Sequence, residues 1–196
     1  MQQEAAGARA PHQFRRRLDD FGLVAMLDHW CQLRRDAGGR LPPRRALDPM
    51  SVRKLLPFVE VYRRSADGRF RCCLSGTAIR SQTGRESTGL HLDELLPPEA
   101  LASRAALFDR ALQSGVPVAY HCHLPVPGRE HKATTRLLLP LADETGQATI
   151  VVSMVVFRVV PLSLSAPAAD PRQAPDAFEA EGAELDPGKI QTPAAA

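Results

Sequence analysis

Hydrophobic residues recur at intervals of three and four between residues 19 and 40, the spacing of one face of an α-helix. Asp19 or Asp20 precedes this stripe as a candidate N-cap, and Gly38 with Gly39 follows it. The pattern predicts an amphipathic N-terminal helix whose apolar face packs against another part of the fold. The stripe includes Phe21, Val24, Leu27 and Trp30.

Five later segments are rich in β-branched and other apolar residues and are bounded by turn residues, which is typical of strands. Asp67 and Gly68 are a strong hairpin signal between the first two, and Gly128 and Gly146 mark turns between the last three. The predicted strands are Phe58 to Arg63, Phe70 to Leu74, Val116 to Leu124, Lys132 to Leu141 and Ala148 to Val159.

Helical segments are predicted between these strands and before them. Pro98 to Ser114 has the clearest amphipathic pattern, with proline in its first turn and Gly115 after its last residue. Short helical turns are expected over residues 77 to 96, and a further short helix from Asp48 to Leu56. The order of elements is therefore two strands, a helical crossover and three strands.

The last predicted strand is apolar at both alternating sets of positions, so both sheet faces need cover. The crossover helices cover one face, and the N-terminal helix, from the same chain or from a partner, covers the other. We expect a homodimer with this helix at or near the interface; the alternative is a monomer whose helix folds back on its own sheet. The residues assigned to this outer face are Phe21, Val24, Leu27, Trp30, Ile150, Val152 and Met154.

Composition limits the classes of protein to which the chain can belong. It has 196 residues, 44% of them hydrophobic and 24% charged, as in ordinary soluble domains. Its longest apolar run, from Ala148 to Phe157, is shorter than the roughly 20 residues of a membrane helix, and no secretory signal is recognised. We expect a cytoplasmic protein. Cys31, Cys72, Cys73 and Cys122 show no CxxC spacing, which argues against a disulfide scaffold and a structural zinc site.

The two ends of the chain differ in charge and composition from its central part. Residues 161 to 196 have a net charge of −4 and are rich in proline and alanine, whereas the whole chain has a net charge of +3. Such a segment buries too little apolar surface to order itself, so a disordered acidic tail is expected, as is a poorly ordered segment over residues 1 to 18. Basic residues elsewhere are scattered, and we expect no nucleic-acid binding.

Several short motifs, in their order and spacing, resemble those of PAS sensor domains. They are Gly76-Thr77-Ala78-Ile79, Gly84-Arg85 with Gly89, Glu94-Leu95, Pro98-Glu99, Ala111-Leu112 with Pro117-Val118, and Leu139 to Gly146. The resemblance implies an α+β fold with a five-stranded antiparallel sheet and a helical cap over residues 41 to 160, preceded by the helix of residues 19 to 40. The segment Leu27 to Asp48 is similar to that of short bacterial PAS proteins without an output domain. This implies a non-catalytic signalling module acting on a separate signalling protein.

Strand and turn lengths, compared with PAS domains, imply which side chains line a small-molecule cavity. Arg136 is notable because a guanidinium facing an apolar interior needs a carboxylate or another acceptor. We hypothesise that it holds a small anionic ligand. Alternatively it pairs with an internal acid such as Asp93 or Glu94, or it faces solvent because an error of one residue turns Leu137, Leu139 and Leu141 inward. The inward set is Tyr120, Cys122, Leu124, Thr134, Arg136, Leu138, Val151, Ser153 and Val155.

The cofactor remains unknown from the sequence. The stretch Gly84 to Gly89 lacks the reactive cysteine of flavin-binding PAS members, and Pro98 to Ser114 lacks the axial histidine common in haem-binding members, although His91 lies just before it. His121 and His123 lie at alternate strand positions, with His131 beyond the turn. Two such histidines are more often exposed or interface side chains than metal ligands, and we assign no metal site.

Two functions from different classes remain open. One is a sensor that binds a small ligand and transmits through dimer contacts; the other is an interaction adaptor whose core is filled. A small enzyme has little support, because Asp93 and Glu94 are adjacent and point apart, and no nucleophile elbow or phosphate-binding glycine loop is recognised.

Overall fold

The computed structural model describes residues 13–124, 132–159 and 176–180. Its helices are α1 (Gln13–Leu18), α2 (Phe21–Asp36), α3 (Thr77–Thr83), α4 (Leu92–Leu95) and α5 (Pro98–Ser114), with 3₁₀ turns η1 (Arg44–Ala46) and η2 (Leu56–Phe58). Its strands are β1 (Val59–Arg64), β2 (Phe70–Ser75), β3 (Val118–His123), β4 (Lys132–Ala142), β5 (Ala148–Val159) and β6 (Asp176–Glu179).

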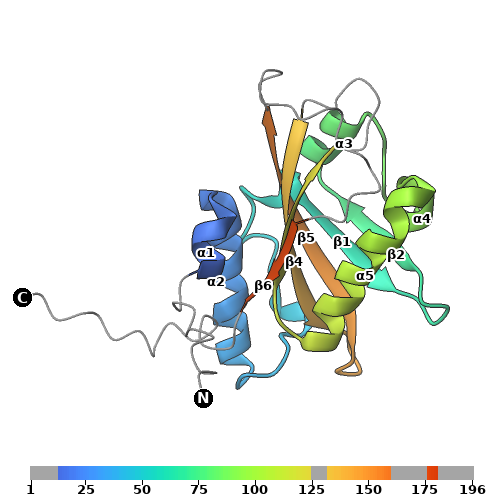
Figure 1. The fold of residues 1–196 in the computed structure, drawn as a ribbon. Helices are drawn as coiled ribbons and strands as arrows, with labels where there is room; N and C mark the ends of the chain where they lie inside the picture. The colour runs from blue at the N-terminus through green and yellow to red at the C-terminus, as the bar shows by residue number, and fades with distance from the viewer. Residues whose placement is uncertain (1–12, 125–131, 160–175, 181–196) are drawn as a thin grey trace, which may run out of the picture.

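The fold is α+β, with one sheet of order β2-β1-β5-β4-β3-β6 between two layers of helices. All described strand pairs are antiparallel. Helices α1 and α2 lie on one face, called the outer face below, and α5 with the cap helices α3 and α4 lies on the inner face (Figure 1). The PAS-like arrangement expected from the sequence is confirmed, with a sixth strand added to the expected five.

Alternation along the central strands separates two hydrophobic cores. Leu137, Leu139 and Leu141 of β4 belong to the outer core, together with the apolar side of α2. Leu138 of β4 and Val151 of β5 belong to the inner core, together with the buried side of α5. Both sides of the middle strands are therefore shielded from water, as the apolar character of both sets of positions requires.

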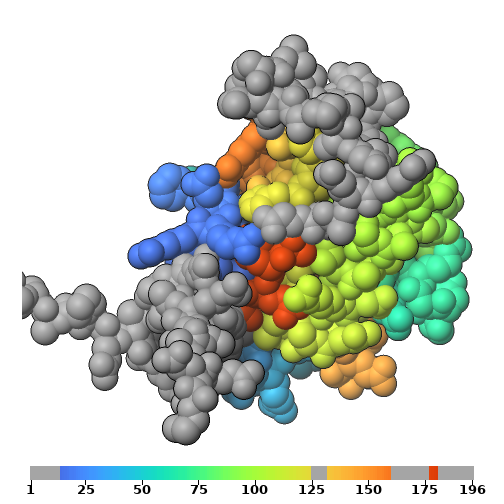
Figure 2. Space-filling model, in the orientation of Figure 1, coloured from blue at the N-terminus to red at the C-terminus, as the bar shows by residue number. Residues whose placement is uncertain are grey.

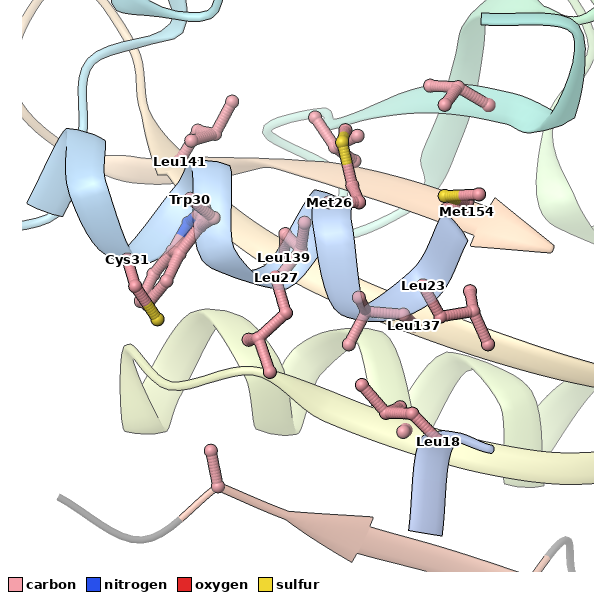
Figure 3. Packing of buried hydrophobic residues seen from close by; sticks show 14 of the residues in the cluster. Leu18, Leu23, Met26, Leu27, Trp30, Cys31, Leu137, Leu139, Leu141 and Met154 are labelled. Atoms are coloured by element: carbon pink, nitrogen blue, oxygen red, sulfur yellow. The ribbon is translucent and has the colours of Figure 1, made fainter. Parts of the chain in front are cut away.

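Helix α2 folds back on the sheet of its own chain. The Asp20 carboxylate caps it by accepting from the amides of Gly22 and Leu23 at 2.8 and 3.0 Å. Trp30 is buried, and its Nε1 donates to the carbonyl of Pro140 at 2.8 Å. Figure 3 shows the buried side of α2 against β4 and β5, and this side is formed by Leu23, Met26, Leu27, Trp30 and Cys31.

This placement changes the argument for a dimer. Ile150, Val152 and Met154 of β5 are buried against the helix of the same chain, so the outer face does not need a partner to cover it. Phe21, which the sequence places on the outer sheet face or at a dimer interface, is 96% exposed, and Val24 is only partly buried. Phe21 is the first residue of α2, where the stripe has rotated away from the sheet.

The helix expected from Asp48 to Leu56 is absent: this segment forms turns that lead into η2. The Asp48 carboxylate accepts from the Met50 amide at 3.0 Å and from the Ser51 hydroxyl at 3.1 Å. Such local side-chain hydrogen bonds compete with helical ones and explain the difference.

Two short elements lie in segments that the sequence indicated to be disordered. The rings of Phe14 in α1 and Phe178 in β6 meet edge to face at 5.2 Å, and both side chains are buried. Strand β6 pairs with the edge of β3, and the amide of the next residue, Ala180, donates to the Pro117 carbonyl at 3.0 Å. Figure 2 shows β6 in red between α1 and α5. Residues 13–18 and 176–180 therefore form ordered elements within the two segments expected to be disordered or poorly ordered. The remaining residues of both segments lie outside the described ranges.

Candidate functional site

A cavity of about 250 Å³ lies between the inner face of the sheet, α5 and the cap. Strand β1 contributes Glu60 and Tyr62, and α5 contributes Arg104 and Phe108. Leucines from α4 and its surroundings complete an apolar wall. Of the nine residues that the sequence assigned to a pocket, Tyr120, Cys122, Leu124, Thr134 and Arg136 line this cavity.

The other four assigned residues lie on the inner face but away from the cavity. Leu138 and Val151 are packed in the inner core with Phe108. Ser153 is buried and accepts a hydrogen bond from Arg136, and Val155 is fully buried. Where α5 packs directly on the sheet, side chains fill the space, so the cavity occupies only the part of the inner face that borders the cap.

Arg136 forms a buried ion pair within the chain. Its Nη1 donates to Oε2 of Glu60 at 2.6 Å and to Oγ of Ser153 at 3.1 Å. The Glu60 side chain is 3% exposed and the Arg136 side chain 17%. Burial is the largest single effect and lowers the pKa of Arg136. The charge and hydrogen bond of the Glu60 carboxylate, together with contributions from Tyr120 and Tyr62, outweigh burial and raise the pKa of the guanidinium above its usual value.

The internal acid is therefore Glu60 and neither Asp93 nor Glu94. Asp93 pairs with Arg69 at 2.8 Å, and Glu94 accepts from the backbone amide of His91 at 2.7 Å. Sequence reasoning missed Glu60 although a signal existed: it is an acid within Val59 to Tyr62, a stretch in which all four residues are buried. A charge at such a position needs a buried partner.

Arg104 is the second basic group of the cavity, and sequence reasoning missed it too. It lies three residues after Leu101 and four before Phe108, on the apolar side of α5. The residue is 7% exposed, and its Nη1 has no hydrogen-bond partner among the described residues. Its guanidinium carbon lies 5.2 Å from the centre of the Tyr120 ring, within range of a cation–π contact.

Two buried phenols complete the polar lining. Burial raises the pKa of Tyr120 to about 12, and it also raises the pKa of Tyr62 well above its usual value. Both hydroxyls therefore stay protonated at neutral pH and are able to donate. The Tyr62 ring meets Phe108 edge to face at 5.1 Å, which fixes its orientation.

The histidines of β3 have other surroundings. Nδ1 of His121 lies 3.0 Å from the Thr135 hydroxyl, and its ring lies against Phe178 with centroids 5.5 Å apart. Within residues 13–124, 132–159 and 176–180, no group of three or more His, Cys, Asp or Glu side chains is arranged to hold a metal ion. His131 lies outside these ranges.

A larger hollow of about 520 Å³ lies at the C-terminal end of α2, beside the turn between β4 and β5. Arg40, Arg45 and Glu144 are among the exposed side chains that line it. It lacks the buried polar groups of the inner cavity. We therefore take the inner cavity as the candidate site.

Comparisons with known proteins agree with this architecture. A family profile described as PAS domain matches residues 20–156, which is most of the chain. A comparison with curated proteins finds no match. Helix α1 and strand β6, and with them the Phe14–Phe178 contact, lie outside the matched residues. Among the helices in the described ranges, none combines the length and the apolar character that spanning a membrane requires.

Proposed function

Because this chain belongs to the PAS domain family, whose members are generally sensory modules, we propose that it binds a small molecule in the inner cavity and passes its state to a protein partner. The observation that carries the proposal is the cavity itself, about 250 Å³ with a largely apolar wall and a few buried polar groups. Binding sites for small molecules have this character. The proposed role is non-catalytic and cytoplasmic.

The contacts of α5 offer a route by which ligand binding in the cavity could change the surface of the protein. This helix forms one wall of the cavity and ends at Ser114, and the carbonyl of the next residue, Gly115, accepts from Nη1 of Arg34 at 2.7 Å. Arg34 belongs to α2, whose first residue, Phe21, is 96% exposed. We propose that a shift of α5 moves α2, and that a second copy or a separate signalling protein docks at the exposed end of α2.

Native mass spectrometry of the purified chain of 21.4 kDa tests both parts. Binding predicts a retained small molecule, and transmission between copies predicts a dimer that light scattering also detects. Cys122→Phe fills the cavity and should abolish retention, whereas Cys73→Phe, at an exposed cysteine outside the cavity, should leave it intact. If the measured mass is that of the protein alone, and no tested small molecule stabilises the protein against unfolding, an adaptor without a ligand would be favoured. A monomer at all concentrations would refute transmission between copies.

A further inference from the structure

We propose, as a refinement that rests on the proposed function, that the cavity takes a small organic monoanion: a carboxylate on an apolar or aromatic body, with the carboxylate bound by Arg104. The proposal starts from the charges that line the cavity. These are the guanidinium groups of Arg85, Arg104 and Arg136 and a single carboxylate, Glu60.

The three guanidinium groups are not equivalent. Arg136 is neutralised by Glu60 at 2.6 Å. Arg85 is exposed at the edge of the cavity, where water solvates it, and its Nη1 already donates to the Glu94 carbonyl at 2.7 Å. Arg104 is only 7% exposed, and no carboxylate among the described residues pairs with it.

A buried charge without a partner is strongly unfavourable, which is why buried charges in proteins are paired. The Tyr120 ring at 5.2 Å stabilises the cation through its π face, but it accepts no in-plane N–H hydrogen bond. A planar guanidinium with free N–H groups matches a carboxylate, which accepts two parallel hydrogen bonds.

The rest of the lining indicates what the carboxylate is attached to. Leu92, Leu95, Leu96 and Phe108 contribute apolar surface to the lining. The volume of about 250 Å³ lies just below the usual range for drug-sized ligands, so the occupant is small. One uncompensated buried cation balances one negative charge, so a monocarboxylate fits better than a phosphate dianion.

Calorimetric titration of the full-length protein tests this chemistry with benzoate and hexanoate, their neutral isosteres benzamide and hexanamide, and inorganic phosphate. We expect at least one acid to bind, and its amide and phosphate to bind at least about tenfold more weakly. Arg104→Gln should weaken the binding of the acid by about tenfold or more, and Arg104→Lys should restore part of this affinity. Arg80→Gln removes an exposed arginine outside the cavity and should change nothing.

A stability measurement separates a binding role from a structural one. If Arg104 is kept for a ligand, Arg104→Met should raise the melting temperature of the ligand-free protein, because it removes an unpaired buried charge. If Arg104 is structural, the same substitution lowers it.

Three results would overturn the inference. The first is that the wild-type protein binds an acid and its amide equally well, a result that does not depend on any variant folding. The second is that Arg104→Gln binds the acid as tightly as the wild-type protein does. The third is that neither acid binds at millimolar concentration. If a neutral molecule is nevertheless retained by the purified protein, the sensory proposal stands and only the carboxylate is refuted. If none of the tested compounds binds and native mass spectrometry shows the protein without any retained small molecule, both the carboxylate proposal and the sensory proposal are refuted.

Discussion

Glu60 and Arg136 lie on strands β1 and β4, which are separated in the sheet by β5, and their side chains meet above that middle strand at 2.6 Å. Ser153 of β5 is the register partner of Glu60 and accepts from the same Nη1 of Arg136 at 3.1 Å. The pair thus links three strands on the inner face and forms one polar wall of the cavity.

This geometry predicts an asymmetric response to substitution. Glu60→Gln alone should destabilise the protein by about 3–5 kcal/mol, because it leaves the Arg136 charge buried and unpaired. The double variant Glu60→Leu with Arg136→Met should recover most of this loss, since two packed apolar side chains replace the pair. Urea unfolding of the three proteins measures both effects. A loss below about 0.5 kcal/mol in the single variant, typical of surface sites, would show that the pair is not buried in solution.

The contact between Phe14 and Phe178 should couple the two ends of the described chain. A double-mutant cycle with Phe14→Ala and Phe178→Ala is expected to give a coupling energy of about 0.5–1.5 kcal/mol, as for other edge-to-face pairs. Phe21→Ala is the matched control and should change the unfolding free energy by less than about 0.5 kcal/mol, because Phe21 is 96% exposed. Strictly additive effects would mean that β6 does not pack on α1.

Gly76 should tolerate no side chain, for steric reasons. A Cβ at this position would lie 2.3 Å from the Pro57 carbonyl oxygen and 2.5 Å from that of Leu56, so the backbone itself would have to move. We expect Gly76→Ala to destabilise by about 3 kcal/mol.

Gly84→Ala is the control for this prediction. Gly84 has a φ of +73° but open space around it, so alanine there should cost only about 1–2 kcal/mol, for conformational reasons. Thermal unfolding of both variants gives the comparison. Equal losses would contradict the close approach of Gly76 to the segment before β1.

The hydrogen bonds of Asp143 predict a specific dependence of the protein's stability on pH. Hydrogen bonds from the hydroxyls of Thr145 and Thr149 and from nearby backbone amides lower its pKa from 3.8 to about 2. A lowered pKa in the folded state means that the ionised group stabilises the fold above 3.8 and that this contribution disappears as the pH falls to about 2. The difference in melting temperature between wild type and Asp143→Asn should therefore be largest above pH 3.8 and vanish near pH 2. A difference independent of pH would show that the hydrogen bonds do not favour the charged form.

Long and strongly patterned segments were predictable from the sequence. The bounds expected for the helix from Pro98 to Ser114 and for the strand from Ala148 to Val159 are those of α5 and β5. In each of these segments many residues follow the same hydrophobic period, so a few residues that depart from it do not change the prediction. The alternation along β4 likewise separates the residues of the two cores.

The partners of single charged residues were not predictable in the same way. Glu60 and Arg136 are 76 residues apart, and their contact depends on the register of two strands against β5. Arg104 occupies an apolar position in a helix that also carries many exposed polar residues, and only packing against Tyr120 shows that its charge is buried. Strand β6 has four residues in a segment rich in proline and alanine, and the open edge of β3 provides its hydrogen bonds.

The central claim is that the space between α5, the cap and the sheet is a binding site for a small molecule. A crystal structure of the full-length protein, purified from cells without added ligand, tests it most directly. We predict density for a bound small molecule within the cavity lined by Tyr62, Phe108 and Tyr120. A structure in which the surrounding side chains close this space and the Arg104 side chain turns to solvent would contradict it.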